Sequence, residues 1–264
     1  MNRLIQTAGL RLNVVDEGRR DAQVVVLSHS LAANLTMWAP QAQALSQDYR
    51  VIRYDTRGHG ASDVPTGAYN FAQLTADVIT LLDSLGITRA HFVGLSLGGM
   101  TALGLALEYS TRIASICAAN CTAQAPVGAE AMWDERINSA HRHGMAALVE
   151  PTVKRWFTAN MLSTRADEVE PVRRMIATTP VAGYAGCGAA LKTLAYRERL
   201  AELRLPALFI AGAQDPAVPV AAMVDMHTRV PGSRLLELPA AHLSNLECAP
   251  AFNTALRDFL RAQA

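Results

Sequence analysis

Short apolar runs alternate with helical patterns along most of the chain, and this alternation predicts the fold class. Continuous apolar runs at 24–28, 91–95 and 207–212 are typical of strands buried on both faces of a sheet. Between them, apolar residues recur at helical spacing, as over 71–85, where Gly86 follows as a helix stop. Further strands are expected at 3–6, 11–15, 51–54, 113–120 and 234–238. The pattern predicts an α/β fold with a mostly parallel sheet and helices on both faces.

The alternation breaks between residues 122 and 200, which show helical patterns without a clear strand. Strand and helix then alternate again to the last helix, around Phe252 to Leu260. We therefore expect residues 1–121 and 201–264 to form the core, with 122–200 as a helical cap inserted above the sheet.

Composition excludes several classes of function. The 264 residues are half hydrophobic and carry a net charge of +1 with no basic stripe, so nucleic acid and anionic membranes are poor partners. No run is long enough to span a bilayer, and the N-terminus lacks a signal-type apolar segment. The cysteines lack zinc or redox spacing: Cys117, Cys121, Cys187 and Cys248. We expect a cytoplasmic protein without metal or cofactor. The sequence is compatible with both a monomer and a homo-oligomer.

The segment 91–100 carries the strongest chemical signal. An apolar strand runs into Gly94-Leu95-Ser96-Leu97-Gly98, a G-x-S-x-G motif, and a helix of small residues follows. This order is that of a nucleophile elbow, in which a tight turn lifts the serine hydroxyl out of the sheet. The strained turn needs small neighbours, and the glycines supply them. The Leu97 amide at the helix start then faces an oxyanion formed on the attacked carbonyl.

A serine hydroxyl needs a general base, and the base needs an orienting acid. Asp215 follows the strand at 207–212, and His242 follows the final strand, which is the order Ser, Asp, His expected on this scaffold. The alternative for Asp215 is an N-cap of the helix at 218–229. Six other histidines compete with His242, but none follows the last strand: His29, His59, His91, His141, His143 and His227. A second oxyanion donor is assigned by position to the Leu31 amide, so its loop should be rigid.

With these motifs, the chain resembles the α/β-hydrolase superfamily and, within it, the 3-oxoadipate enol-lactonases of aromatic catabolism (the β-ketoadipate pathway). The matching segments are 27–41, 51–63, 91–100, 155–157, 183–191 and 241–247, which cover core and cap. The resemblance implies a triad of Ser96, Asp215 and His242, oxyanion donors at Leu31 and Leu97, and hydrolysis of an enol-lactone to a 3-oxo acid with water and no cofactor.

Substrate recognition is less defined by the sequence. We place His29, Trp133, Arg155 and Trp156 at the substrate pocket, with Arg155 as the first candidate to bind a substrate carboxylate. Other basic cap residues are candidates too: Arg142, Lys154, Arg173, Arg174 and Lys192. The lactonases carry Asn in place of His29 and an acidic stretch where this chain has 192–196. A carboxylesterase or another lactonase is therefore the alternative.

Two other classes of protein are weaker interpretations. A ligand-binding receptor on the same scaffold can retain a triad, and steady multiple turnover would distinguish an enzyme from it. A nucleotide-dependent redox enzyme is disfavoured because no G-x-G-x-x-G follows a strand.

Overall fold

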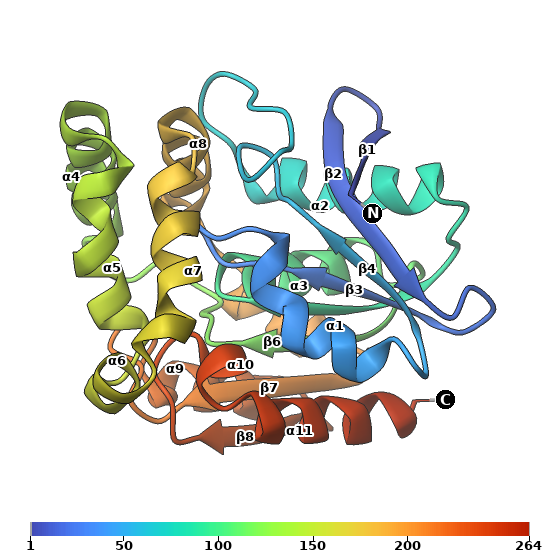
Figure 1. Ribbon diagram of the computed structural model, residues 1–264. Coiled ribbons are helices and arrows are strands. Elements are labelled where there is room, and N and C mark those ends of the chain that lie inside the picture. Colours follow the sequence, from blue (N-terminus) through green and yellow to red (C-terminus); the bar gives the residue numbers. More distant parts are fainter. Residues whose placement is uncertain (1, 264) are drawn as a thin grey trace.

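A single sheet organises the protein in the computed structural model, which describes residues 2–263 (Figure 1). Its strands, in chain order, are β1 (Arg3–Gln6), β2 (Arg11–Gly18), β3 (Val24–Ser28), β4 (Arg50–Tyr54), β5 (Ala90–Leu95), β6 (Ile113–Ala119), β7 (Ala207–Gly212) and β8 (Arg234–Leu238). Their spatial order is β1-β2-β4-β3-β5-β6-β7-β8. β1 and β2 pair in antiparallel fashion, and β2 pairs likewise with β4. All the other pairs are parallel, which confirms the mostly parallel sheet predicted from the sequence.

Helices cover both faces of this sheet. The core helices are α1 (Ala39–Leu45) with the preceding 3-10 turn η1 (Leu35–Trp38), α2 (Phe71–Ser84), α3 (Leu97–Glu108), α9 (Val220–Arg229), α10 (Ser244–Glu247) and α11 (Ala249–Arg261). α1 packs with α11, and α2 packs with α3 on the other face (Figure 1). Asn70 and Gln73 form a capping box that starts α2, and Gly86 takes a left-handed φ of 65° just beyond its end.

The segment between β6 and β7 is helical, as predicted. It contains α4 (Ala129–His143), η2 (Met145–Leu148), α5 (Val149–Trp156), α6 (Ala159–Thr164), α7 (Ala166–Thr178), α8 (Val181–Lys192) and η3 (Arg197–Glu202). Figure 1 shows α4 to α8 standing beside the sheet, at the left of the view. An isolated antiparallel bridge joins Gln124 to Ala195, so the two ends of the segment meet. This closure supports our proposal that 122–200 is a cap on a core of 1–121 and 201–264.

The cap rests closely on the core at α8. A Cβ atom added to Gly183 would lie 1.8 Å from the Gly58 carbonyl oxygen, so only glycine fits this contact. Across residues 2–263, no helix combines the length and apolar character that crossing a membrane requires.

Candidate active site

Ser96 occupies a strained turn between β5 and α3, as the elbow motif predicts. Its φ of 55° and ψ of −113° are unfavourable for a residue with a side chain, and neighbouring groups hold them. The Ser96 amide donates to the Ala119 carbonyl at 2.9 Å. A Cβ added to Gly94 would lie 2.0 Å from the Gly98 carbonyl oxygen, and one added to Gly98 would lie 2.1 Å from the Ser28 carbonyl oxygen. Both glycines are thus required by backbone contacts, and the turn leaves Ser96 partly exposed.

Asp215 and His242 form a buried hydrogen-bonded pair. His242 Nδ1 lies 2.7 Å from Asp215 Oδ2, and both side chains are almost wholly buried. Asp215 Oδ1 accepts from the amides of Ala217 and Val218, so the carboxylate is held at both oxygens. The N-cap of α9 is Pro219, so Asp215 does not cap that helix. With Nδ1 as the donor, the neutral imidazole has its lone pair at Nε2, where a general base needs it.

The surroundings favour the ionised form of Asp215. Burial alone raises the pKa of this carboxyl group, but the charge and hydrogen bond of His242, together with the Asn120 amide, outweigh it. The pKa of Asp215 therefore lies below its ordinary value. The group therefore remains a carboxylate at neutral pH, which is the form that the orienting acid of a triad requires.

Sheet order brings the three predicted triad residues to one edge. Ser96, Asp215 and His242 follow the carboxyl ends of β5, β7 and β8, and only β6 separates β5 from β7. Among residues 2–263, the Ser96 hydroxyl takes part in no hydrogen bond that the structure records. Within residues 2–263, the structure therefore contains the hydrogen bond between Asp215 and His242 but none between His242 and Ser96. Catalytic hydrogen bonds of this kind are often loose before substrate binds.

Backbone strain gathers at the same edge. Within residues 2–263, three non-glycine residues have a positive φ: Ala32 at 59°, Ser96 at 55° and Asn120 at 46°. They follow β3, β5 and β6, which are neighbours in the sheet. Such conformations persist where the surrounding structure enforces them, and they cluster at functional sites.

The two predicted oxyanion donors lie on neighbouring elements. Leu97 is the first residue of α3, and Leu31 lies in the loop after β3, which pairs with β5. In the described part of the chain, neither amide has a recorded acceptor within the protein. Both amides therefore stay candidate donors to an oxyanion.

Two buried histidines hold the loop that carries Leu31. His29 Nε2 accepts from the Thr56 amide at 2.9 Å, and His59 Nε2 accepts from the Ala32 amide at 3.0 Å. Burial lowers the pKa of His29 to about 4 and that of His59 to about 3, so both rings are neutral at pH 7. The Leu35 amide donates to Asp55 Oδ1 at 2.7 Å. These bonds give a physical basis for the rigidity expected of the loop.

His29 does not line a cavity, which corrects its assignment to the substrate pocket. The residue is 0% exposed. Its Nδ1 lies 2.7 Å from the Ser30 carbonyl oxygen and its Nε2 accepts from Thr56, so neither ring nitrogen is free for a substrate. The ring is a structural support of the Leu31 loop.

The predicted cap tryptophans differ in their surroundings. Trp156 is buried, and its ring stacks with the His242 imidazole at a centroid distance of 6.1 Å. Its carbonyl also accepts from the Leu243 amide, so it supports the loop of the proposed base. Trp133 is partly buried, with its ring 6.3 Å from that of Tyr184. The guanidinium of Arg136 lies over Trp133, 5.0 Å from the ring centroid.

Two arginines of the cap, Arg136 and Arg155, are partly buried and lack a carboxylate partner among residues 2–263. Arg155 is partly buried, and its Nε has no hydrogen-bond partner among the described residues. Burial lowers the pKa of Arg136, and the positive charge of Arg155 lowers it further. Across residues 2–263, neither guanidinium has a carboxylate oxygen within salt-bridge distance. Sequence reasoning missed Arg136, although its position three residues after Trp133 on one helix was a usable signal.

The other basic candidates of the cap are engaged or exposed. Arg173 pairs with Glu150 at 2.7 Å, and Lys192 pairs with Asp134. The remaining three side chains lie in solvent: Arg142, Lys154 and Arg174. The Arg136 and Arg155 pair is therefore the better candidate for an anion.

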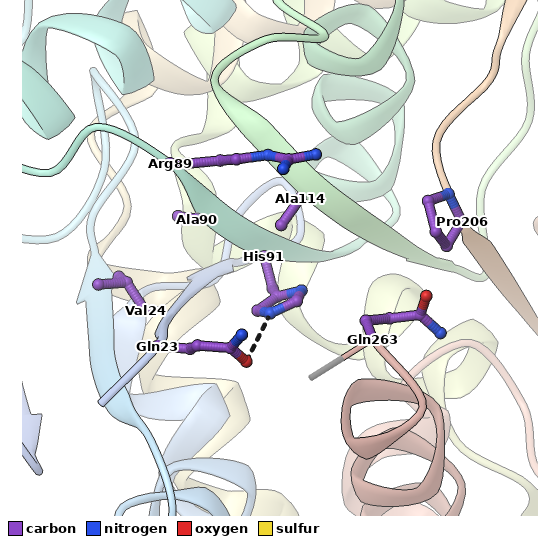
Figure 2. Close-up of a pocket in the computed structure, with 8 residues that line it drawn as sticks. All are labelled: Gln23, Val24, Arg89, Ala90, His91, Ala114, Pro206 and Gln263. Carbon is purple, nitrogen blue, oxygen red and sulfur yellow. Dashed lines mark hydrogen bonds between the residues drawn. The ribbon is translucent and has the colours of Figure 1, made fainter.

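A separate cavity of about 380 Å³ lies at the opposite edge of the sheet (Figure 2). It is lined by residues at the amino ends of strands, including Val24, Ala90 and His91. His91 Nδ1 lies 2.8 Å from Ser115 Oγ, and its Nε2 lies 3.3 Å from Gln23 Oε1. The triad candidates follow the carboxyl ends, so this cavity does not belong to the candidate active site.

Comparison with known proteins identifies the family of the chain. The family model of the alpha/beta hydrolase fold matches residues 23–248. The chain is 37% identical to 3-oxoadipate enol-lactonase 2 of Acinetobacter baylyi, over 95% of this chain and 93% of the relative. It superposes on the crystal structure of the enol-lactonase from Burkholderia xenovorans LB400 with a TM-score of 0.96 and 38% identity, covering 98% of this chain and 100% of the other. A putative carbamate hydrolase RutD of a Caulobacter species is 32% identical over 92% of each chain.

The chain therefore belongs to the α/β-hydrolase fold family, and it is a carboxylic ester hydrolase. Within that family it resembles the 3-oxoadipate enol-lactonases.

Proposed function

We propose that the protein opens a small enol-lactone that carries a carboxylate, with 3-oxoadipate enol-lactone as the preferred substrate and 3-oxoadipate as the product. The observation that carries this choice is the pair of unpartnered arginines in the cap, Arg136 and Arg155. Arg155 directly precedes Trp156, whose ring stacks with the proposed base His242. The names of the most similar relatives support the same substrate. Such a reaction belongs to aromatic catabolism.

In the first half-reaction, Ser96 Oγ attacks the lactone carbonyl carbon while His242 Nε2 takes the hydroxyl proton. The Leu31 and Leu97 amides stabilise the resulting oxyanion; losing one such donor typically costs about 3 kcal/mol of transition-state stabilisation. The ring carbon–oxygen bond then breaks, and the leaving enolate oxygen takes the proton from His242. The acyl chain stays attached to Ser96 as an ester, and the enol becomes a ketone in the same molecule.

In the second half-reaction, His242 removes a proton from water, and the hydroxide attacks the ester carbonyl. The bond to Ser96 Oγ breaks, His242 returns the proton to the serine, and the acid leaves. Asp215 holds the imidazole in the tautomer with a free Nε2 and stabilises its charged form in both steps.

A small ester or a carbamate is the second candidate substrate. The 32% identity to a putative carbamate hydrolase supports this second candidate. An ester, a lactone and a carbamate each have a carbonyl group that the same serine can attack. Only the cap contacts distinguish these substrates.

The first experiment replaces the proposed nucleophile. Ser96→Ala should abolish hydrolysis of p-nitrophenyl acetate and labelling by a fluorophosphonate, while thermal unfolding stays close to that of the wild type. Ser110→Ala, at an exposed position, is the matched control and should keep both the hydrolysis and the labelling. Activity retained in Ser96→Ala would overturn the proposed mechanism.

The second experiment ranks substrates by kcat/KM at steady state. The enol-lactone should exceed an aliphatic lactone, p-nitrophenyl acetate and a simple carbamate. A higher kcat/KM for the ester or the carbamate would reject the lactone assignment while leaving the mechanism intact. A single turnover without steady state would instead indicate a receptor.

A further inference from the structure

Asn120 lies at the edge where the proposed triad assembles, one residue beyond the end of β6. Its φ of 46° is left-handed, a conformation that asparagine tolerates better than most residues with a side chain. The residue is 1% exposed, and its amide donates to the Ile210 carbonyl of β7 at 2.8 Å. The backbone at this position is thus fixed to the strand that leads to Asp215.

The Asn120 side chain makes three hydrogen bonds. Its Nδ2 donates to Asp215 Oδ2 at 3.0 Å and to the Ala241 carbonyl at 3.3 Å. Its Oδ1 accepts from Ser244 Oγ at 2.5 Å. One amide therefore touches the proposed acid, the residue before His242, and a serine two residues after it.

Two acceptors determine which way the amide faces, and the Ser244 hydroxyl donates to the oxygen that results. Asp215 Oδ2 and the Ala241 carbonyl are acceptors, so the amino group must face them, and the carbonyl oxygen must face Ser244. Ser244 is 0% exposed, so water does not replace its hydroxyl. Gly212 leaves the space for this arrangement: a Cβ there would lie 2.9 Å from Asn120 Nδ2 and 2.3 Å from the Ala241 carbonyl oxygen.

We propose that Asn120 is a positioning residue that fixes the carboxylate of Asp215 toward His242, with Ser244 locking the amide in the productive orientation. The proposal rests on the proposed serine mechanism. Asp215 Oδ2 receives two hydrogen bonds, one from Asn120 and one from His242 Nδ1. The hydrogen bond from the Asn120 amide stabilises the negative charge on that oxygen and holds the carboxylate in its orientation toward His242.

The direct test compares three variants with p-nitrophenyl acetate as the probe substrate. Asn120→Gly removes the side chain at a position where glycine accepts the left-handed φ. It should lower kcat by about tenfold to a hundredfold, because a hydrogen bond to a charged group is lost, with a smaller change in KM. Ser244→Ala should lower kcat in the same direction but less. Asn245→Ala is the matched control: Asn245 is equally buried, but it contacts Met37 and Gln41 instead of Asp215.

The pH dependence of kcat/KM separates positioning from mere support of the fold. Without the Asn120 amide, Asp215 Oδ2 accepts a hydrogen bond only from His242. Its negative charge then stabilises the protonated imidazole more than it does in the wild type. The low-pH limb should move to higher pH in Asn120→Gly, and less in Ser244→Ala, but not in Asn245→Ala. An unmoved limb in both test variants, or a shift equal to that of the control, would overturn the proposal.

The failure of this proposal is distinguishable from that of the serine mechanism. If Ser96→Ala is inactive while Asn120→Gly and Ser244→Ala keep wild-type kcat and pH profile, only the positioning role is wrong. If Ser96→Ala is active, the mechanism itself fails. Should Asn120→Gly not fold, Ser244→Ala still decides the question, since it leaves the residues of the proposed triad unchanged.

Discussion

The indole ring of Trp156 lies against the imidazole of His242, with ring centroids 6.1 Å apart and planes inclined by 28°. Trp156 ends α5 in the cap, whereas His242 follows β8 in the core. The Trp156 carbonyl also accepts from the Leu243 amide at 3.0 Å. Glu247 adds a second link, since its carboxylate accepts from the Ala241 amide and from Thr158 at the start of α6. The cap therefore supports the loop of the proposed base.

Removing this indole should weaken stability and catalysis together. Trp156→Ala deletes a buried aromatic side chain, and we expect a loss of about 3–5 kcal/mol in the free energy of unfolding. Loss of the ring that supports His242 should also lower kcat by about tenfold or more. Urea unfolding and steady-state kinetics measure the two effects. Trp156→Phe keeps an aromatic ring and should retain most of the activity; equal activity in Trp156→Ala would show that the stacking has no catalytic role.

The cap arginines should affect anionic substrates alone. Arg136→Ala and Arg155→Ala should raise KM for a lactone bearing a carboxylate by about tenfold or more, because a charge-assisted contact is lost. Hydrolysis of p-nitrophenyl acetate, which has no carboxylate, should change little. Arg142→Ala is the control from the same cap, since its side chain lies in solvent. Equal losses on both substrates would mean that the arginines serve the fold and not recognition.

The buried histidines should make the protein less stable in acid. The pKa of His29 is lowered to about 4 and that of His59 to about 3, against about 6.5 in an unfolded chain. As the pH falls, the two histidines therefore bind protons in the unfolded state before they do so in the folded state. Their contribution to the free energy of unfolding is complete above pH 6.5 and is lost as the pH falls toward 4 for His29 and 3 for His59. The loss at pH 4.5 should be roughly 2.5 kcal/mol per histidine.

Urea unfolding at pH 7.5 and at pH 4.5 measures this loss. His29→Asn should reduce the difference between the two pH values, although it lowers stability at pH 7.5. His141→Asn, at an exposed position, should leave the difference as it is. A pH dependence in His29→Asn equal to that of the wild type would contradict the expectation.

The elbow glycines should not accept even one added methyl group. Gly98→Ala would place Cβ 2.1 Å from the Ser28 carbonyl oxygen, so β3 or α3 must move, and the Leu97 amide moves with α3. We expect a loss of activity of about a hundredfold or more. Gly128→Ala is the comparison: its φ of 78° is strained, but a Cβ there meets nothing within 4 Å. It should cost only about 1 kcal/mol of stability and leave kcat unchanged; similar losses of activity in both variants would refute the steric argument.

The fold was predictable because its signals are local. β3, β5 and β7 are continuous apolar runs, as strands buried on both faces must be, and α2 carries its own capping residues and a glycine stop. The elbow motif likewise carries its steric reason within a few residues. The helical character of 122–200 followed from the same kind of pattern.

Other features depend on groups that meet from distant parts of the chain. The orientation of the Asn120 amide depends on the acceptors Asp215 and Ala241, which are 95 and 121 residues away. His29 looked like a pocket residue because its loop follows β3, yet its ring turns inward to the Thr56 amide. Arg136 resembled any charged residue on a surface helix until folding placed Arg155 near it without a carboxylate.

By itself, the sequence determined the order of strands and helices, the strained serine turn, and the places of Asp215 and His242 directly after two later strands. These properties depend on hydrophobic periodicity and on steric limits that act between near neighbours. Only the tertiary structure decided which side chains share a hydrogen bond, which charges lack a partner, and which histidines are sealed from water. Those outcomes depend on burial and on distances between residues far apart in the chain, which no local pattern encodes.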